Sequence, residues 1–294
     1  MTTSALARVA AVMGLAVAGL TFNSITPALA EYEIEESRVE KGEKEFEYRG
    51  AVHFGLPKSE DDDDDDDDDA AGGGIFDEEA PVRQSHDFEF EYGITERFQL
   101  STTLITNEPV GDGYGLAGVE IEGKYELIKR EGNGWGLAAG AGYGFGTRSG
   151  EADEIEFGLI TEYAAGLLLL TFNGLFEGQV GNNAETDGLG FGYGWRAEYE
   201  VVPHWGIGVE MFGEIEDLSH SGPWEEQEHS IGPTIFWKPG DDDDDDDGDE
   251  FDLDEDFVPG GPVEMEMSFN VGVQFGLTDE TSDSALKFQG KLEF

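Results

Sequence analysis

The sequence predicts an all-β protein, a transmembrane antiparallel up-and-down β-barrel of about twelve strands. Three observations lead to this fold class. Apolar and polar residues alternate with period two in one run after another, which is the pattern of strands with one apolar and one polar face. Each run is about ten residues long, the length with which a tilted strand crosses a bilayer. The 43 glycines and 12% aromatic residues are also typical of β structure.

The first 30 residues have the pattern of a secretory signal peptide. Arg8 gives a positive start, Val9 to Leu20 form an apolar stretch, and Ala28 to Ala30 make a small-x-small cleavage site. Because a spanning helix needs about 20 apolar residues, this stretch is too short for a membrane anchor. The later runs are shorter still, so residues 31 to 294 are expected to form either a soluble exported domain or a barrel.

The alternating runs follow one another along the chain. The first sets Phe46 and Tyr48 against Glu45 and Glu47, and most later runs repeat this aromatic-against-acidic pattern. The predicted strands cover residues 45 to 56, 87 to 94, 97 to 105, 119 to 126, 135 to 145, 154 to 163, 170 to 180, 189 to 200, 205 to 211, 229 to 237, 264 to 275 and 286 to 294. In the fifth run the apolar residues oppose glycines such as Gly140 to Gly144, which precede no helix and so indicate strand curvature or room in the lumen rather than a nucleotide loop.

A soluble β-sandwich also alternates, but its strands commonly have only about 5 or 6 residues. The aromatic outer face and the acidic inner face favour a barrel in lipid with a wet interior. The connections agree with an even strand number, which returns both ends of the barrel sequence to the periplasm. Residues 57 to 82 are expected to be an Asp-rich external loop. Residues 238 to 262 fall where a short periplasmic turn is expected, and are read either as an Asp-rich insertion or as a sign of a missed strand.

Two acidic tracts stand out. Glu60 to Asp69 holds ten consecutive carboxylates, and Asp241 to Asp256 holds thirteen in sixteen positions. Such tracts repel themselves, so we expect disordered insertions with weak association of Ca²⁺ or Mg²⁺. Candidate ligands for metal, including histidines of a predicted external loop, are Asp61, Asp65, Asp69, Asp241, Asp245, His220 and His229.

The inward parity of the predicted strands carries many more carboxylates than basic groups. An acidic lining would favour cations over anions in an open pore, although twelve strands enclose a space that side chains or the N-terminal segment can partly fill. Lys287 and Lys291 are further expected cross-strand partners of these carboxylates. The candidate lumen-lining residues are Glu45, Arg49, His53, Glu89, Glu91, Glu120, Glu122, Lys124, Glu156, Glu162, Arg196, Glu198, Glu200 and Glu210.

Four segments carry a resemblance to a known family. They are Val39 to Glu47, Tyr92 to Phe98, Ser230 to Phe236, and Gly276 to Phe294. Together they resemble the outer-membrane barrels of the MetA-pathway of phenol degradation family, transporters of the phenol meta-pathway, over most of the chain outside the Asp-rich insertions. The resemblance implies an outer-membrane protein with a transport role. Phe294 also resembles the terminal aromatic residue by which such barrels are recognised for assembly.

We therefore expect a passive channel or transporter for small solutes in the Gram-negative outer membrane. It would prefer cations or carry small hydrophobic or aromatic compounds. The alternative is a structural or surface-interaction barrel with a filled lumen and cation-binding acidic loops. The expected partners are outer-membrane lipid, the barrel-assembly machinery and small solutes. A formal charge of −51 argues against nucleic acid, and the absence of cysteine removes thiolate chemistry. No Ser-His pair is expected on the lipid face, so neither an enzyme nor a cofactor is predicted.

Overall fold

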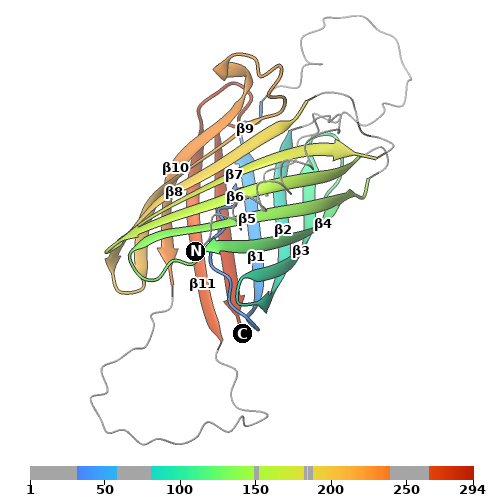
Figure 1. Ribbon diagram of the computed structural model, residues 1–294. Helices are drawn as coiled ribbons and strands as arrows, with labels where there is room; N and C mark the ends of the chain where they lie inside the picture. The colour runs from blue at the N-terminus through green and yellow to red at the C-terminus, as the bar shows by residue number, and fades with distance from the viewer. Residues whose placement is uncertain (1–31, 58–80, 149–151, 182–183, 185–187, 239–264) are drawn as a thin grey trace, which may run out of the picture.

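The computed structural model describes residues 32–57, 81–148, 152–181, 184, 188–238 and 265–294. These residues form a closed barrel in which every strand pairs with its sequence neighbours and β1 pairs with β12 (Figure 1). All pairings are antiparallel, so the predicted up-and-down barrel of twelve strands is confirmed. The predicted signal peptide and both Asp-rich segments lie outside the described residues and stay predictions.

The strands are 10 to 14 residues long and include a strand for each predicted run. They are β1 Lys44–Phe54, β2 Val82–Thr95, β3 Phe98–Pro109, β4 Gly115–Ile128, β5 Gly134–Gly146, β6 Asp153–Ala165, β7 Leu168–Val180, β8 Gly190–Val202, β9 Trp205–Ile215, β10 Glu228–Trp237, β11 Glu266–Gly276 and β12 Ser284–Glu293. A 3-10 helix, Trp224–Glu226, lies between β9 and β10. The described residues contain no helix that is long and apolar enough to cross a membrane.

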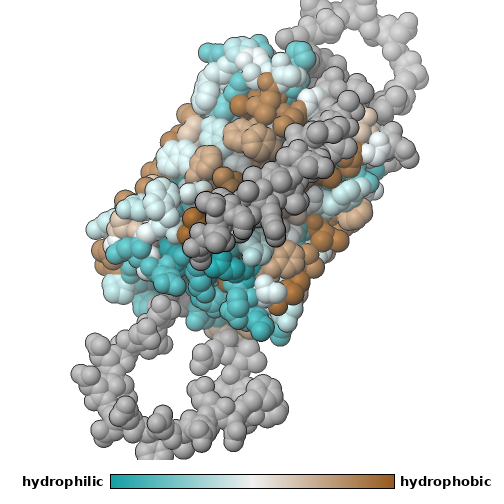
Figure 2. Space-filling model, viewed as in Figure 1, coloured by the Kyte–Doolittle hydropathy of each residue, from teal (hydrophilic) through white to brown (hydrophobic). Residues whose placement is uncertain are grey.

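The alternation in the sequence sorts side chains between the two faces of the wall. The aromatic parity of β1 and β2 is largely exposed, as at Phe46 and Phe90, whereas the acidic parity is buried, as at Glu47 and Glu89. Figure 2 shows hydrophobic side chains spread over the outer wall and hydrophilic ones gathered at the end where the C-terminus lies in Figure 1. The interior of the barrel is therefore mostly polar, and most of its large apolar side chains face outward.

The strand order fixes the two ends of the barrel. β1 and β12 meet along ten paired residues, from Glu45 with Glu293 to Phe54 with Ser284. Phe294 continues this seam, because its N–H donates to the carbonyl oxygen of Lys44 and its own carbonyl accepts from the Lys44 N–H. Since β1 and β10 run in opposite directions, the two Asp-rich segments that follow them start from opposite ends of the barrel. With twelve described strands present, the possibility of a missed strand in residues 238 to 262 has no support among the described residues.

Candidate functional site

The lumen holds a stretch of chain that belongs to no wall strand. Residues 32–43, here called the lumen segment, precede β1 and run inside the barrel (Figure 1). Ile34 is 1% exposed and Val39 is fully buried. These residues belong to no strand, so they are buried because the wall surrounds them, whereas Arg38, Lys41 and Gly42 toward the end of the segment are exposed.

Hydrogen bonds to the wall hold the lumen segment in register. Asn173 of β7 accepts from the backbone N–H of Glu35 at 2.6 Å and donates to the Glu35 carbonyl at 3.1 Å. The hydroxyl of Ser37 donates to the carboxylate of Glu162 on β6. At the end of the segment, Gly42 donates to the carbonyl of Gly93 at 2.8 Å. Backbone polar groups of the segment thus find protein partners in place of lumen water.

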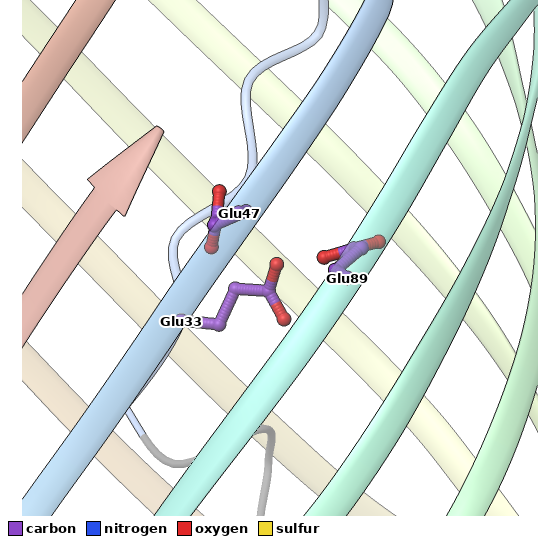
Figure 3. A group of neighbouring side chains, drawn as sticks. All are labelled: Glu33, Glu47 and Glu89. Carbon is purple, nitrogen blue, oxygen red and sulfur yellow. The ribbon is translucent and has the colours of Figure 1, made fainter. Parts of the chain in front are cut away.

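Arg49 of β1 is the centre of one charged cluster. Its Nη1 atom lies 2.5 Å from a carboxylate oxygen of Glu33, 2.8 Å from Glu47 and 2.6 Å from Glu89. Figure 3 shows the three carboxylates converging from the lumen segment, β1 and β2. Their oxygens approach one another closely enough to hold a metal ion, but the positive guanidinium of Arg49 already pairs with all three carboxylates. This cluster joins the lumen segment to the wall.

Two further clusters of ion pairs involve lysines of β12. Lys291 lies 2.8 Å from oxygens of both Glu45 and Glu47. Glu210 of β9 binds Arg196 of the neighbouring β8 at 2.8 Å and Lys287 at 2.5 Å.

The expected cross-strand ion pairs therefore form, with one difference in detail. Lys287 on β12 reaches Glu210 on β9, and these strands are not neighbours. The lysine side chain thus reaches past β10 and β11 on the inner face of the wall, which a strand-by-strand analysis of the sequence does not reveal. Lys124 of β4 likewise extends to Glu35 of the lumen segment at 3.1 Å.

The opposite side of the lumen contains a cavity of about 200 Å³. It lies between the lumen segment and strands β3 to β7, and some aliphatic side chains, such as Ile160 and Leu175, also line it. Its lining includes seven glutamates and, among the described residues, no lysine or arginine. Those glutamates are Glu33, Glu35, Glu120, Glu122, Glu154, Glu156 and Glu177. Of these glutamates, Glu33 and Glu35 belong to the lumen segment and form ion pairs with Arg49 and Lys124. The other five come from the wall strands β4, β6 and β7.

Glycines of β5 make room for this acidic wall. A Cβ atom on Gly140 would collide with the carboxylate of Glu122, and one on Gly142 would collide with that of Glu156. The carboxylates of β4 and β6 therefore lean toward β5 over the space that its glycines leave. The expectation that this glycine run leaves room in the lumen agrees with the position of these side chains.

The structure places most of the candidate lumen-lining residues inside the barrel. Eight are buried: Glu45, Arg49, Glu89, Lys124, Glu162, Arg196, Glu198 and Glu210. Five are half-buried: His53, Glu91, Glu120, Glu122 and Glu156. Glu200 is exposed, because it lies near the end of β8 at the rim.

The structure describes two of the seven candidate metal ligands, His220 and His229. The five aspartates of the acidic tracts lie outside the described residues. His220 is exposed, and its Nδ1 lies 2.8 Å from the carboxylate of Asp217. Hydrogen bonds from Ser219 lower the pKa of Asp217 to about 2. His229 is buried and has both ring nitrogens engaged, with the Tyr193 hydroxyl at 3.0 Å and the Gln227 side chain at 3.1 Å.

Two features of the lumen escaped the sequence analysis. The sequence analysis allowed the N-terminal segment to fill part of the lumen, but it did not identify how residues 32–43 are anchored, because the segment shows no period-two pattern. The apolar Ile34 and Val39 among charged residues are the signal that could have indicated burial. The second feature is a hydrogen bond of 3.0 Å between His53 Nδ1 and the Ser282 hydroxyl, between β1 and the β11–β12 connection. No local motif links residues so far apart in sequence.

Comparison with known proteins shows the fold and little beyond it. No family model matches the chain, and no curated protein matches it in sequence. The chain is similar to the solved COG4313 outer membrane channel from Pseudomonas putida F1, with 10% identity, a TM-score of 0.53, and coverage of 92% of this chain and 100% of that chain. A KdgM porin gives 8% identity, a TM-score of 0.46, and coverage of 85% of this chain and 98% of that chain. Omp33 of Acinetobacter baumannii gives 10% identity, a TM-score of 0.43, and coverage of 86% of this chain and 99% of that chain.

The class of protein is therefore a closed twelve-stranded barrel with an apolar outer face, a fold that this chain shares with an outer-membrane channel. The finer resemblance to the phenol meta-pathway family is not matched by a family model and stays a prediction.

Proposed function

We propose that this protein is a passive, cation-preferring channel for small solutes in the Gram-negative outer membrane. The observation that carries the proposal is the residual cavity, whose lining has seven glutamates and no basic side chain among the described residues. Carboxylates that face a water-filled passage attract cations and repel anions. The outward aromatic belt supports placement in a lipid bilayer, and the fold shared with an outer-membrane channel agrees with it.

The lumen segment limits the size of the solute. It fills the side of the lumen next to β1 and β12, so passage would follow the acidic cavity along β4 to β7. The cavity volume of about 200 Å³ is below the roughly 300 to 1,000 Å³ of pockets that enclose drug-sized ligands. Small hydrated cations therefore suit the passage better than the hydrophobic or aromatic compounds that the family resemblance suggests.

Planar-bilayer recording tests the proposal. Under a KCl gradient we expect a small conductance whose reversal potential lies toward the potassium equilibrium potential. Glu154→Gln with Glu177→Gln lowers the cation preference, whereas Glu225→Gln with Glu226→Gln, the same charge change on the exposed 3-10 helix, leaves it unchanged. Anion preference, or equal effects of the two double variants, would overturn the proposal.

The second candidate is a structural barrel with a filled lumen. The observation that favours it is the anchoring of the lumen segment by Asn173, Ser37 and the Arg49 cluster. Removal of residues 33–43 separates the two functions. A channel conducts before the deletion and conducts several-fold more after it, while a structural barrel conducts only once the segment is gone.

Two further parts of the proposal concern assembly and partners. Phe294 pairs with Lys44 at the β1–β12 seam and would serve as the residue that the barrel-assembly machinery recognises. The acidic tracts that follow β1 and β10 would concentrate Ca²⁺ or Mg²⁺ weakly near the two mouths. No catalytic role or cofactor is part of the proposal.

A further inference from the structure

Three carboxylates of the acidic cavity come together without a basic partner. Glu120 and Glu122 of β4 and Glu156 of β6 each offer one ligand atom, and these atoms lie within 4.8 Å of one another. Lys124, two residues along β4 from Glu122, pairs with Glu35 instead. Unlike the cluster around Arg49, this cluster has no ion pair with lysine or arginine within the described part of the chain.

A fourth carboxylate lies beside the cluster and also lacks a partner. Glu177 of β7 is paired in register with Glu156 and lines the same cavity. Glu177 is only 5% exposed, yet neither of its carboxylate oxygens has a hydrogen-bond partner among the described residues. One carboxylate oxygen of Glu156 also lacks a partner there. Leaving such a buried acceptor unpaired is costly, so these oxygens point to a ligand that the protein itself does not supply.

The wall is shaped to let these carboxylates converge. The side chains of Glu122 and Glu156 extend from opposite sides over Gly140 and Gly142 of β5, where any Cβ atom would collide with them. In the strand register, Gly142 of β5 pairs with Glu122 on one side and with Glu156 on the other. Only a glycine, without a side chain, therefore lies between the two glutamates. The convergence is thus built into the backbone and does not depend on flexible loops.

The chemistry of the donors selects the ligand. All are carboxylate oxygens, with no imidazole or thiolate among them, which suits a hard divalent cation. Ca²⁺ accepts six to eight oxygen ligands in a flexible geometry, which suits carboxylates that come from separate strands and whose oxygens lie within 4.8 Å of one another. Mg²⁺ binds at about 2.0 to 2.1 Å and retains its water more strongly, so it fits less well.

We propose that Glu120, Glu122 and Glu156, with Glu177 beside them, form a Ca²⁺ site in the wall of the lumen. The site is distinct from the Asp-rich tracts, and it does not require that the barrel conduct ions. A bound divalent cation there would replace mutual repulsion of the carboxylates with attraction, and would tie β4 to β6 across the glycines of β5.

Calorimetric titration of the full chain, folded in detergent, with CaCl₂ at pH 7.5 tests the site. The wild type is expected to bind one Ca²⁺ more tightly than the background of the acidic tracts. Glu122→Gln with Glu156→Gln weakens this binding about tenfold or more, because two of the ligand charges are lost. The control is Glu45→Gln, which removes a lumen carboxylate already paired with Lys291 at 2.8 Å and leaves the isotherm unchanged.

The acidic tracts are present in every variant, so their contribution cancels in the comparison. Superimposable isotherms for wild type and the double variant would overturn the proposal and show that the cluster holds only shared protons. An equal loss in Glu45→Gln would overturn it as well. Should the double variant not fold, Glu120→Gln, which removes one of the same three ligands, decides the question by the same titration. Because binding is measured directly, a chain that carries no current in bilayers still tests the site.

Discussion

Removal of Arg49 should strongly destabilise this barrel, because this group pairs with three carboxylates. Its side chain is 5% exposed, and its Nη1 contacts Glu33, Glu47 and Glu89 at 2.5 to 2.8 Å. In Arg49→Met a side chain of similar length replaces the guanidinium, and three carboxylates whose oxygens lie within 4.8 Å of one another lose their shared cation. Breaking one buried ion pair by removing a partner costs about 3 to 5 kcal/mol, and we expect a loss in this range here because Lys291 still contacts Glu47.

Urea unfolding of the barrel in detergent, followed by tryptophan fluorescence, measures the change in the free energy of unfolding. The matched control is Arg38→Met, which removes an exposed pair with Glu40 and should cost less than about 1 kcal/mol. Adding Glu89→Gln to Arg49→Met removes one uncompensated carboxylate and is expected to recover part of the loss. Equal free energies for the Arg49 and Arg38 variants would refute the reasoning, since burial would then not decide the strength of these pairs.

Of three further predictions, two concern the lumen and one concerns the connection between β9 and β10. Gly142→Ala retains the barrel but displaces the Glu156 carboxylate, so calorimetric Ca²⁺ affinity falls several-fold while circular dichroism is unchanged; an unchanged affinity would contradict the role of the glycine. Asn173→Ala removes two hydrogen bonds to the lumen segment, each worth about 0.5 to 1.5 kcal/mol, so bilayer recordings should show more frequent large openings, and identical recordings would count against anchoring. Ser219→Ala removes hydrogen bonds to ionised Asp217, so its pKa, measured by NMR titration, rises from about 2 toward its ordinary value; a pKa that stays near 2 would show that Ser219 is not the cause.

The sign of the Asp217 effect fixes its pH window. Hydrogen bonds to the charged carboxylate lower its pKa in the folded protein, so their stabilisation is present above the unfolded pKa near 4 and is lost as the pH falls toward about 2. In the Ser219→Ala variant this acid-range dependence should shrink, while behaviour at neutral pH stays the same.

The sequence by itself determined the wall of this protein. Side chains alternate sides along any strand, so the aromatic residues of the first run, such as Phe46, and its acidic ones, such as Glu47, had to lie on opposite faces. Twelve such runs with an even count close into an up-and-down barrel, and the glycines opposite Trp135 and Tyr143 indicated an inner surface with free space. These are local properties of the chain, which is why one sequence was enough to predict them.

The tertiary structure alone decided what fills the lumen and where its charges pair. The position of residues 32–43 depends on partners such as Asn173, which is separated from Glu35 by 138 residues. The ion pair of Lys287 with Glu210 depends on the inward curvature that brings β12 and β9 within reach past two intervening strands. Parity tells which side of a strand a carboxylate faces, but only closure of the sheet brings Glu120, Glu122 and Glu156 together in one place while giving the cluster of Glu33, Glu47 and Glu89 an arginine.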